Sequence, residues 1–447
     1  MRSFNNISSD LNEQVPNEWE VTKLNLIANL RRGPFGGALK VDNFVSEGYA
    51  VYEQQHAIHK KLSNIRYFID EKKYKEMQAF LVEKNDILLS CSGTIGESVI
   101  IPTNYKEGII NQALLRIRLL RPDINLEYFK YYMDSYLFQT LITDNSHGSA
   151  MKNIASMNVI NKIPVPVPSE DEQEKIVLIL NSKLKVLDRT IDMKYKILEL
   201  LEKQRQSIIT EAVTKGLNPN VKMKDSGVEW IGEVSENINF IKLKYLVAIK
   251  ITDGPHETPT LKDEGIPFIS AEAIKNGKVD FNYKRGFISA EDHEKYSKKC
   301  SPRKGDIFMV KSGATTGKFG IVETEEEFSI WSPLALIRAD LSKVNILFLY
   351  YCFYSTIFQM QVQTGWNYGT QQNIGMGVIE NLFIPCPSLE EQNEVVNYIV
   401  IKDREMVDLI SQINVQIEKL KEYRQALIYE AVTGKIDVCD MELELVR

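Results

Sequence analysis

Two long stretches of the chain repeat apolar residues at alternating spacings of three and four positions. The first stretch holds Leu180, Leu184, Leu187, Ile191, Leu198, Leu201, Ile208 and Ala212, with Lys194 and Arg205 in the intervening slots. The second holds Ile399, Met406, Ile410, Ile413, Ile417, Leu420, Leu427 and Ala431, with Asp403 and Arg424 as polar members. This spacing is typical of a heptad seam. Each stretch predicts a helix of about 45 residues, which is about 65 to 70 Å long.

Start and stop signals flank both predicted helices. Ser169–Glu172 and Ser388–Glu391 each place a serine three residues before a glutamate, which predicts a capping box for the amides that open a helix. Gly216 and Gly434 follow the last periodic residues and predict the helix ends. Both copies therefore begin and end in the same way.

The chain is a doubled unit. Subtracting Arg205 from Arg424 and Gln173 from Gln392 gives the same offset of 219 residues. So long a period indicates a duplicated domain rather than a solenoid. Because about 20 residues link the first helix to the second copy, we expect the second helix to return antiparallel to the first. The expected molecule is a dumbbell with pseudo-twofold symmetry.

The repeat predicts two α/β (α+β) heads in tandem, separated by two long helices that form an antiparallel coiled-coil spacer. Short β-rich runs such as 86–89 and 306–310, mixed with a helical stretch at 126–142, support this fold class. The expected segments are a first head at 1–165, a first helical spacer at 166–217, a linker at 218–233, a second head at 234–385, a second helical spacer at 386–436 and a C-terminal tail at 437–447.

Matching turns recur in both heads. Ser92–Gly96 corresponds to Ser312–Gly317, and Asn153–Ile154 corresponds to Asn373–Ile374, whereas the sequences between them diverge. The glycine turns either cradle phosphates or are plain hairpin turns, and the GxxxxGK[ST] pattern of a nucleotide-binding loop is missing. A common frame with different loops is what two readers of different ligands would show.

The net charge of -6 and the pI near 5.7 argue, taken alone, against a nucleic-acid binder. Local basic clusters oppose this average, although each is also explained as a solvated surface. The clusters are Arg31-Arg32, Lys60-Lys61, Lys72-Lys73, Lys298-Lys299 and Arg303-Lys304. The five cysteines stand singly, and there is no signal-like start or long apolar run, so we expect a cytoplasmic protein.

Catalytic patterns are weak. Pro168–Lys175 loosely echoes a metal-dependent nuclease motif, but the second copy lacks the lysine and helix capping explains both copies. No HExxH motif or paired-cysteine metal site occurs, and the five histidines are scattered. We expect no metal site and no catalysis by this chain alone.

The layout resembles the DNA specificity (S) subunit of a Type I restriction-modification system over nearly the whole chain. The residues that carry the resemblance are the linker Asp225–Gly232, the pairs Glu172-Gln173 and Glu391-Gln392 after the proline exits, the endings Glu211–Thr214 and Glu430–Thr433, and the openings Gly33–Gly36, Asp253–His256 and Gly265–Phe268. The resemblance implies that each head is a target-recognition domain for one half of a split, asymmetric sequence in double-stranded DNA. It also implies that the helices set the unread spacing between the two halves.

The resemblance further implies two methyltransferase (M) subunits docked on the conserved helices, and motor-nuclease (R) subunits in the restriction complex. S-adenosylmethionine would bind to the partner subunits, as would the ATP and Mg²⁺ of restriction, and this chain would bind no cofactor. One alternative is a dumbbell adaptor that binds proteins instead of DNA. Another is the specificity subunit of a related methyltransferase system without a separate motor.

Amide, hydroxyl, aromatic and basic side chains near the turns suit base edges and phosphates. The candidate DNA-binding residues are Arg31, Arg32, Lys40, Ser92, Thr94, His147, Lys152, Asn153, His256, Lys311, Ser312, Thr315, Thr316, Lys318, Trp366, Tyr368, Gln371, Gln372 and Asn373. His256 either faces DNA or stabilises its turn. Arg205 and Arg424 either contact a partner or pair with glutamates across the seam and fix its register.

Overall fold

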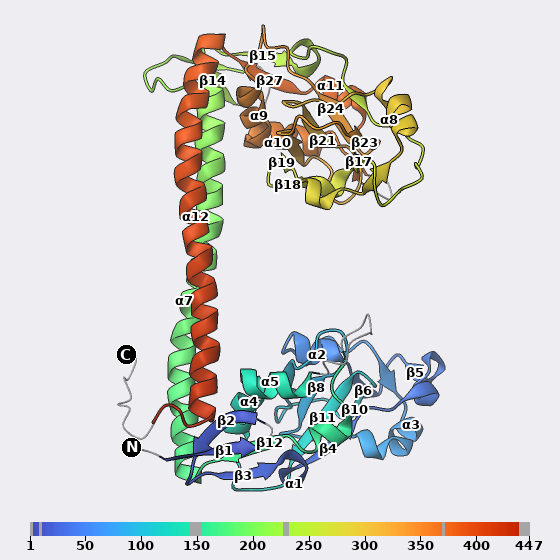
Figure 1. The fold of residues 1–447 in the computed structure, drawn as a ribbon, viewed down its shortest axis with the longest axis vertical. Helices are drawn as coiled ribbons and strands as arrows, with labels where there is room; N and C mark the ends of the chain where they lie inside the picture. Colours follow the sequence, from blue (N-terminus) through green and yellow to red (C-terminus); the bar gives the residue numbers. More distant parts are fainter. Residues whose placement is uncertain (1–2, 9–10, 144–152, 227–231, 369–371, 438–447) are drawn as a thin grey trace. The chain divides into compact units, whose positions relative to one another are not determined.

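The computed structural model describes residues 3–8, 11–143, 153–226, 232–368 and 372–437, and the chain divides into two compact units (Figure 1). The first unit comprises residues 1–194 and 415–447, and the second comprises residues 195–414. Each unit holds one head and part of both long helices, α7 (Glu170–Lys215) and α12 (Leu389–Val432). These helices have 46 and 44 residues, close to the length predicted from the heptads.

The two long helices run antiparallel, as predicted. In the first unit, Leu184 near the start of α7 shares a buried cluster with Leu427 near the end of α12. In the second unit, Ile209 near the end of α7 shares a buried cluster with Ile399 near the start of α12. The heptad positions are the buried or half-buried residues of both helices, which confirms the seam.

The serine caps form at both helix starts, but their glutamates differ. The Ser388 hydroxyl accepts from the Glu391 amide at 3.3 Å, and the Glu391 carboxylate accepts from the Ser388 amide at 3.0 Å, which is the full capping box. The Ser169 hydroxyl accepts from the Glu172 amide at 3.4 Å, while the Glu172 carboxylate accepts a 3.0 Å hydrogen bond from the indole of Trp19. The first copy thus uses its capping glutamate to hold the head.

The first head contains two four-stranded sheets. The antiparallel sheet has the order β4 (Ala28–Arg32), β11 (Leu114–Leu119), β8 (Ile87–Ser90), β9 (Ser98–Ile100), and the mixed sheet has the order β10 (Gly108–Ile110), β6 (Tyr49–Tyr52), β7 (Phe68–Ile69), β5 (Phe44–Val45). Two further pairs are β1 (Phe4–Ser8) with β2 (Leu11–Pro16) and β3 (Glu20–Lys23) with β12 (Pro164–Val167). The helices are α1 (Leu24–Ile27), α2 (Gln54–Ile58), α3 (Glu71–Glu76), α4 (Leu126–Asp134), α5 (Tyr136–Ile142) and α6 (Met157–Ile160).

The second head repeats this frame with a larger sheet. Its six strands have the order β16 (Thr252–Asp253), β24 (Leu334–Ile337), β21 (Ile307–Val310), β22 (Phe319–Ile321), β19 (Lys278–Val279), β18 (Ile274–Lys275). The smaller sheets are β20 (Gly286–Ile288), β17 (Ile266–Ile269) and β23 (Ser329–Ile330); β15 (Asn239–Lys242) with β27 (Phe383–Cys386); β13 (Met223–Asp225) with β14 (Glu233–Ser235); and β25 (Asn367–Tyr368) with β26 (Gln372–Asn373). The helices are α8 (Ala290–Ser297), α9 (Ile346–Tyr354), α10 (Thr356–Thr364) and α11 (Met376–Glu380).

The helical stretch predicted at 126–142 is two helices. Ser135 ends α4 and starts α5, because its hydroxyl accepts from the Phe138 amide as an N-cap. Ser355 makes the same break between α9 and α10 in the second head. The apolar pattern continues through each break, so the sequence periodicity did not reveal it.

One ion pair on a buried aspartate occurs in both heads and shows how closely they match. Arg118 donates from two nitrogens to the Asp86 carboxylate at 2.7 and 2.8 Å, and Arg338 donates to the Asp306 carboxylate at 2.7 and 2.7 Å. The aspartates differ by 220 positions (306 minus 86), against 219 in the helices. The two heads are therefore copies with small insertions and deletions between their common elements.

Candidate nucleic-acid interface

In both heads the glycine turn lies beside the Asn-Ile segment that was singled out in the sequence. In the first head, the Ile154 amide donates to the Cys91 carbonyl at 3.1 Å, and the Ser92 hydroxyl lies 3.4 Å from Oδ1 of Asn153. In the second, the Ile374 amide donates to the Lys311 carbonyl at 2.8 Å. The fold thus joins two polar segments that are far apart in sequence.

The glycine turn of the second head connects β21 to β22 as a hairpin. Its amides donate to carbonyls inside the protein: Gly313 to Gln372, Thr316 to Gly313, Gly317 to Val310 and Lys318 to Thr315, at 2.8 to 3.1 Å. The buried Thr316 hydroxyl lies 2.8 Å from the Gly313 carbonyl and 3.1 Å from that of Gln372. These hydrogen bonds favour the hairpin interpretation over a phosphate cradle.

Side chains on this surface differ in exposure. Thr94, Asn153, Lys318, Gln372 and Asn373 are exposed, whereas Ser92, Ser312 and Thr315 are half-buried. The Trp366 ring is half-buried and packs on the core of the second head. Tyr368 supplies backbone to β25, and His147, Lys152 and Gln371 lie outside the described residues. The exposed group is available to a ligand without rearrangement.

The first head carries three further predicted residues on its edge strand and the following loop. Arg31 and Lys40 are exposed, and the Arg31 guanidinium lies 5.9 Å from the centre of the Phe80 ring. The half-buried Arg32 guanidinium lies 5.3 Å from the centre of the exposed Phe35 ring. Cations over aromatic faces combine charge with a flat stacking surface, which suits nucleic acid.

The edge strands of both heads lead into the same Gly-Pro turn. Arg32 pairs with Leu115 of β11, and Asp253 pairs with Ala335 of β24, so Arg32 and Asp253 occupy corresponding positions. The next residue is Gly33 in the first head and Gly254 in the second. A Cβ atom on Gly33 would lie 1.8 Å from the Asn111 carbonyl oxygen, and a Cβ atom on Gly254 would lie 2.0 Å from the Ile330 carbonyl oxygen. Only glycine fits at either turn, whereas the residue before it is the cation Arg32 in the first head and the anion Asp253 in the second.

Asp253 collects three basic groups in the second head. Its carboxylate accepts from Lys299 at 2.6 Å and from Lys311, and it lies 3.3 Å from Nε2 of His256. Burial alone would raise the pKa of the Asp253 carboxyl, but the hydrogen bonds from Lys299 and Lys311 outweigh it and hold that pKa below its usual value. Lys311 and His256 were predicted as site residues, and the structure brings them together on one carboxylate.

Sequence reasoning missed Asp253 and Lys299 as site residues, although their segments were noticed. Asp253 belongs to the opening at 253–256, and Lys299 belongs to the basic cluster at 298–299. Nothing in the sequence shows that two lysines 46 and 58 positions further on share this carboxylate. Only the three-dimensional structure shows that Lys299 and Lys311 both contact Asp253.

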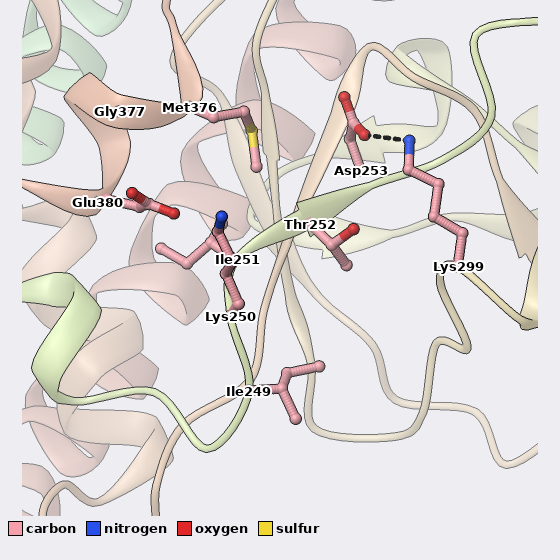
Figure 2. Close-up of a pocket in the computed structure, with 9 residues that line it drawn as sticks. All are labelled: Ile249, Lys250, Ile251, Thr252, Asp253, Lys299, Met376, Gly377 and Glu380. Atoms are coloured by element: carbon pink, nitrogen blue, oxygen red, sulfur yellow. Dashed lines mark hydrogen bonds and ion pairs between the residues drawn. The ribbon is translucent and has the colours of Figure 1, made fainter.

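A cleft of about 610 Å³ opens beside this cluster (Figure 2). It is bordered by Asp253 and Lys299 on one side and by α11 on the other, with the exposed Lys250 between them. Because α11 begins three residues after Asn373, the cleft adjoins the paired segments described above. Lys311 immediately precedes the glycine turn and donates to Asp253, which borders the cleft, so the glycine turn, the Gly-Pro turn and the cleft adjoin one another in the second head.

The predicted register residues pair with the other long helix. Nε of Arg205 donates to Asp403, and the guanidinium also lies 5.1 Å from the centre of the Tyr354 ring. Nε of Arg424 donates to Asp188 at 2.9 Å. The partners on the other helix are aspartates and not the expected glutamates, and only Asp403 is mostly buried, whereas Asp188 is about half exposed. Both contacts favour the register interpretation.

Among the residues that the structure describes, no group of three His, Cys, Asp or Glu side chains is arranged to hold a metal ion. Within the same residues, no helix combines the length and apolar character that crossing a membrane requires.

Comparison with known proteins gives a consistent result. The family model described as "Type I restriction modification DNA specificity domain" matches residues 16–203 and again residues 235–419. The MjaVIII specificity subunit of a Type I restriction enzyme from Methanocaldococcus jannaschii is 24% identical over 430 residues, which cover 95% of this chain and 94% of that protein. The EcoBI specificity subunit from Escherichia coli is 22% identical, and the match covers 97% of this chain and 91% of that protein.

A solved structure shares the fold. One of its chains superposes with a TM-score of 0.67 at 16% identity, covering 94% of this chain and 99% of that one. That structure concerns the structural basis of complex assembly and conformational transition of the type I R-M system.

Proposed function

Because the chain belongs to the family of Type I restriction modification DNA specificity domains, we propose that it selects the DNA target of a Type I restriction-modification complex. Each head reads one half of a split, asymmetric sequence in double-stranded DNA. The observation that carries this proposal is the double family match, one match for each head with its following helix. The repeated turn geometry with different side chains in the two heads supports two different half-sites.

Methyltransferase subunits dock on the long helices. In the first unit α7 exposes Val186 and Met193, and in the second unit α12 exposes Val400 and Val407. The seven-residue spacing places each pair on one face of its helix, outside the buried seam. Two apolar side chains exposed on one helix face can form the centre of a contact with a partner subunit. Motor-nuclease subunits join the same assembly for restriction.

The chemistry belongs to the partners. Methylation uses S-adenosylmethionine in the methyltransferase subunits, and restriction uses ATP and Mg²⁺ in the motor-nuclease subunits. The chain itself contributes target choice and geometry, and it works in the cytoplasm on double-stranded DNA. With a net charge of -6, it gains from partners that help to enclose the DNA.

The test is to co-express the chain with the methyltransferase subunit of its system and to map N6-methyladenine across the host DNA by single-molecule sequencing. A control culture lacks this chain. We expect a split motif that appears only when the chain is present. No new methylation despite a stable complex would reject the proposal in favour of an adaptor.

Docking is tested by co-purification. We expect Val186→Glu combined with Met193→Glu to reduce recovery of the methyltransferase subunit by about tenfold or more, because charges would enter an apolar contact. The matched control is Leu26→Glu, which changes an exposed leucine of the first head. Equal recovery with the helix variant and the control would exclude this face as the docking site.

A further inference from the structure

The Asp253 carboxylate is the centre of a cluster in which the side chains differ greatly in exposure. The side chains of Asp253 and Lys311 are 10% and 12% exposed, whereas those of Lys299 and His256 are 45% and 74% exposed. Lys311 therefore supplies a mostly buried positive charge that cancels the carboxylate. Lys299 and His256 provide the part of the cluster that solvent or a ligand can reach.

The Lys299 ammonium is fixed in direction. It donates to Asp253 at 2.6 Å and to the Gly254 carbonyl at 2.9 Å. An ammonium has three donors, so one N–H remains and its direction follows from the other two. Two anchored hydrogen bonds also reduce the rotamer freedom of a lysine, which is otherwise large. The cluster thus presents one oriented donor beside the cleft shown in Figure 2.

Comparison of the two heads argues against a purely structural role for Asp253. The structural ion pair of the fold, Asp86 with Arg118, recurs as Asp306 with Arg338. By contrast, the position of Asp253 is occupied by Arg32 in the first head, where the same Gly-Pro turn forms. Because the fold accepts either charge at this position, the difference belongs to what each head binds.

We propose that Asp253 is a positioning residue for target recognition by the second head, acting through Lys299 with Lys311 as its buried counter-charge. Lys299 then donates its remaining N–H to an acceptor on double-stranded DNA from a fixed point, which sets the register of this head on its half-site. The carboxylate also lowers the positive charge of the cluster from two to one, so DNA of the wrong sequence gains less from it. This inference rests on the proposed function.

The experiment uses the complex of this chain with its methyltransferase subunit and a DNA duplex that carries the motif found by methylation mapping. Affinity is measured against salt for that duplex and for duplexes with one base pair changed in either half. We expect Asp253→Asn to raise affinity for unrelated DNA about threefold, as expected when one nearby negative charge is removed in water. Its slope of log affinity against log salt should steepen by up to about 0.9.

The same variant should discriminate about tenfold less well against changes in the half-site of the second head, with discrimination in the other half-site unchanged. Asp253→Glu should recover part of the loss. The matched control is Asp306→Asn, which removes another buried carboxylate of the same head and should leave the salt slope unchanged. Discrimination by Asp253→Asn equal to that of the unaltered complex would overturn the inference, as would behaviour identical to the control.

A second variant covers the case in which Asp253→Asn fails to fold. Lys299→Met should lower affinity for all duplexes and make the salt slope shallower by about 0.9, opposite in sign to Asp253→Asn. An unchanged slope in Lys299→Met would also overturn the inference. Failure of the proposed function is a separate result, because the unaltered complex would then show no split methylation motif.

Discussion

Arg205 and Asp403 form an ion pair between the two long helices, with side chains that are 16% and 19% exposed. Arg205 is also held by Glu202 at 3.2 Å on its own helix and by the face of Tyr354 from the second head. The pair therefore links α7, α12 and α9 within the second unit. The corresponding Arg424 pairs with Asp188, whose side chain is 52% exposed.

The difference in burial between the Arg205–Asp403 and Arg424–Asp188 pairs predicts a difference in their contributions to stability. Arg205→Met should lower the free energy of unfolding by about 1 to 3 kcal/mol, between the values for exposed and buried pairs, because Asp403 loses its cation. The double variant Arg205→Met with Asp403→Leu should recover much of that loss. Urea denaturation followed by circular dichroism measures the effect, and Arg424→Met is the matched control, with an expected loss below about 1 kcal/mol. Equal losses for both arginines would contradict the difference in burial.

Gln392 holds the second head on α12. Its Oε1 accepts from the Asn345 amide at 2.7 Å, and its Nε2 donates to the carbonyls of Lys343 at 3.2 Å and Pro387 at 2.9 Å. Gln173 makes the equivalent three hydrogen bonds in the first unit. Both glutamines are fully buried, which explains the Glu-Gln pairs noticed after the proline exits.

Gln392→Leu should therefore remove hydrogen bonds from three backbone groups that are buried or partly buried, and cost about 2 to 5 kcal/mol in unfolding free energy. Gln412→Leu, at an exposed position of the same helix, is the control and should change stability by less than about 0.5 kcal/mol. Thermal unfolding monitored by calorimetry distinguishes the two. A similar melting temperature for both variants would show that water replaces the lost hydrogen bonds.

The heptad seam was predictable because a period of three and four residues is a local property of the sequence. The antiparallel order was predictable because only about 20 residues link the first helix to the second copy. The break at Ser135 was not, since the apolar pattern of α4 continues into α5 and only the cap geometry separates them. The aspartate partners of Arg205 and Arg424 and the lysines on Asp253 depend on contacts between distant segments. Side-chain pairing of this kind follows from the packed fold and leaves no periodic signal.

The buried cysteines predict a pH dependence of stability. Burial raises the pKa of the Cys91 and Cys300 thiols to about 12 and raises that of Cys352 well above its usual value. The unfolded thiols titrate near pH 8.5, so the folded state binds more protons between about pH 8.5 and pH 12. The contribution of the three buried thiols to the free energy of unfolding is therefore fully present below about pH 8.5 and is lost as the pH rises from about 8.5 to 12.

Alkylation tests whether these cysteine thiols are buried and protonated in the folded protein. With iodoacetamide at mildly alkaline pH, Cys91, Cys300 and Cys352 should stay unmodified in the folded protein and react in denaturant, because the thiolate is the nucleophile. Cys386 is only half-buried and should react first among these four. Peptide mass spectrometry gives the order of modification. Rapid reaction of Cys352 in the folded protein would contradict its complete burial.

Lys318 offers the sharpest test of the glycine turn as part of the DNA interface, because its side chain is exposed while its amide is fixed in the hairpin by the Thr315 carbonyl at 3.0 Å. Lys318→Ala removes a charge and leaves that backbone bond intact. If Lys318 contacts a phosphate, affinity should fall similarly on all sequences and the salt slope should become shallower by about 0.9. Lys304→Ala, which removes an exposed lysine paired with Glu325 elsewhere in the head, is the matched control. Loss confined to one base position would instead mean that Lys318 reads a base edge, and equal affinities for Lys318→Ala and the control would remove this turn from the interface.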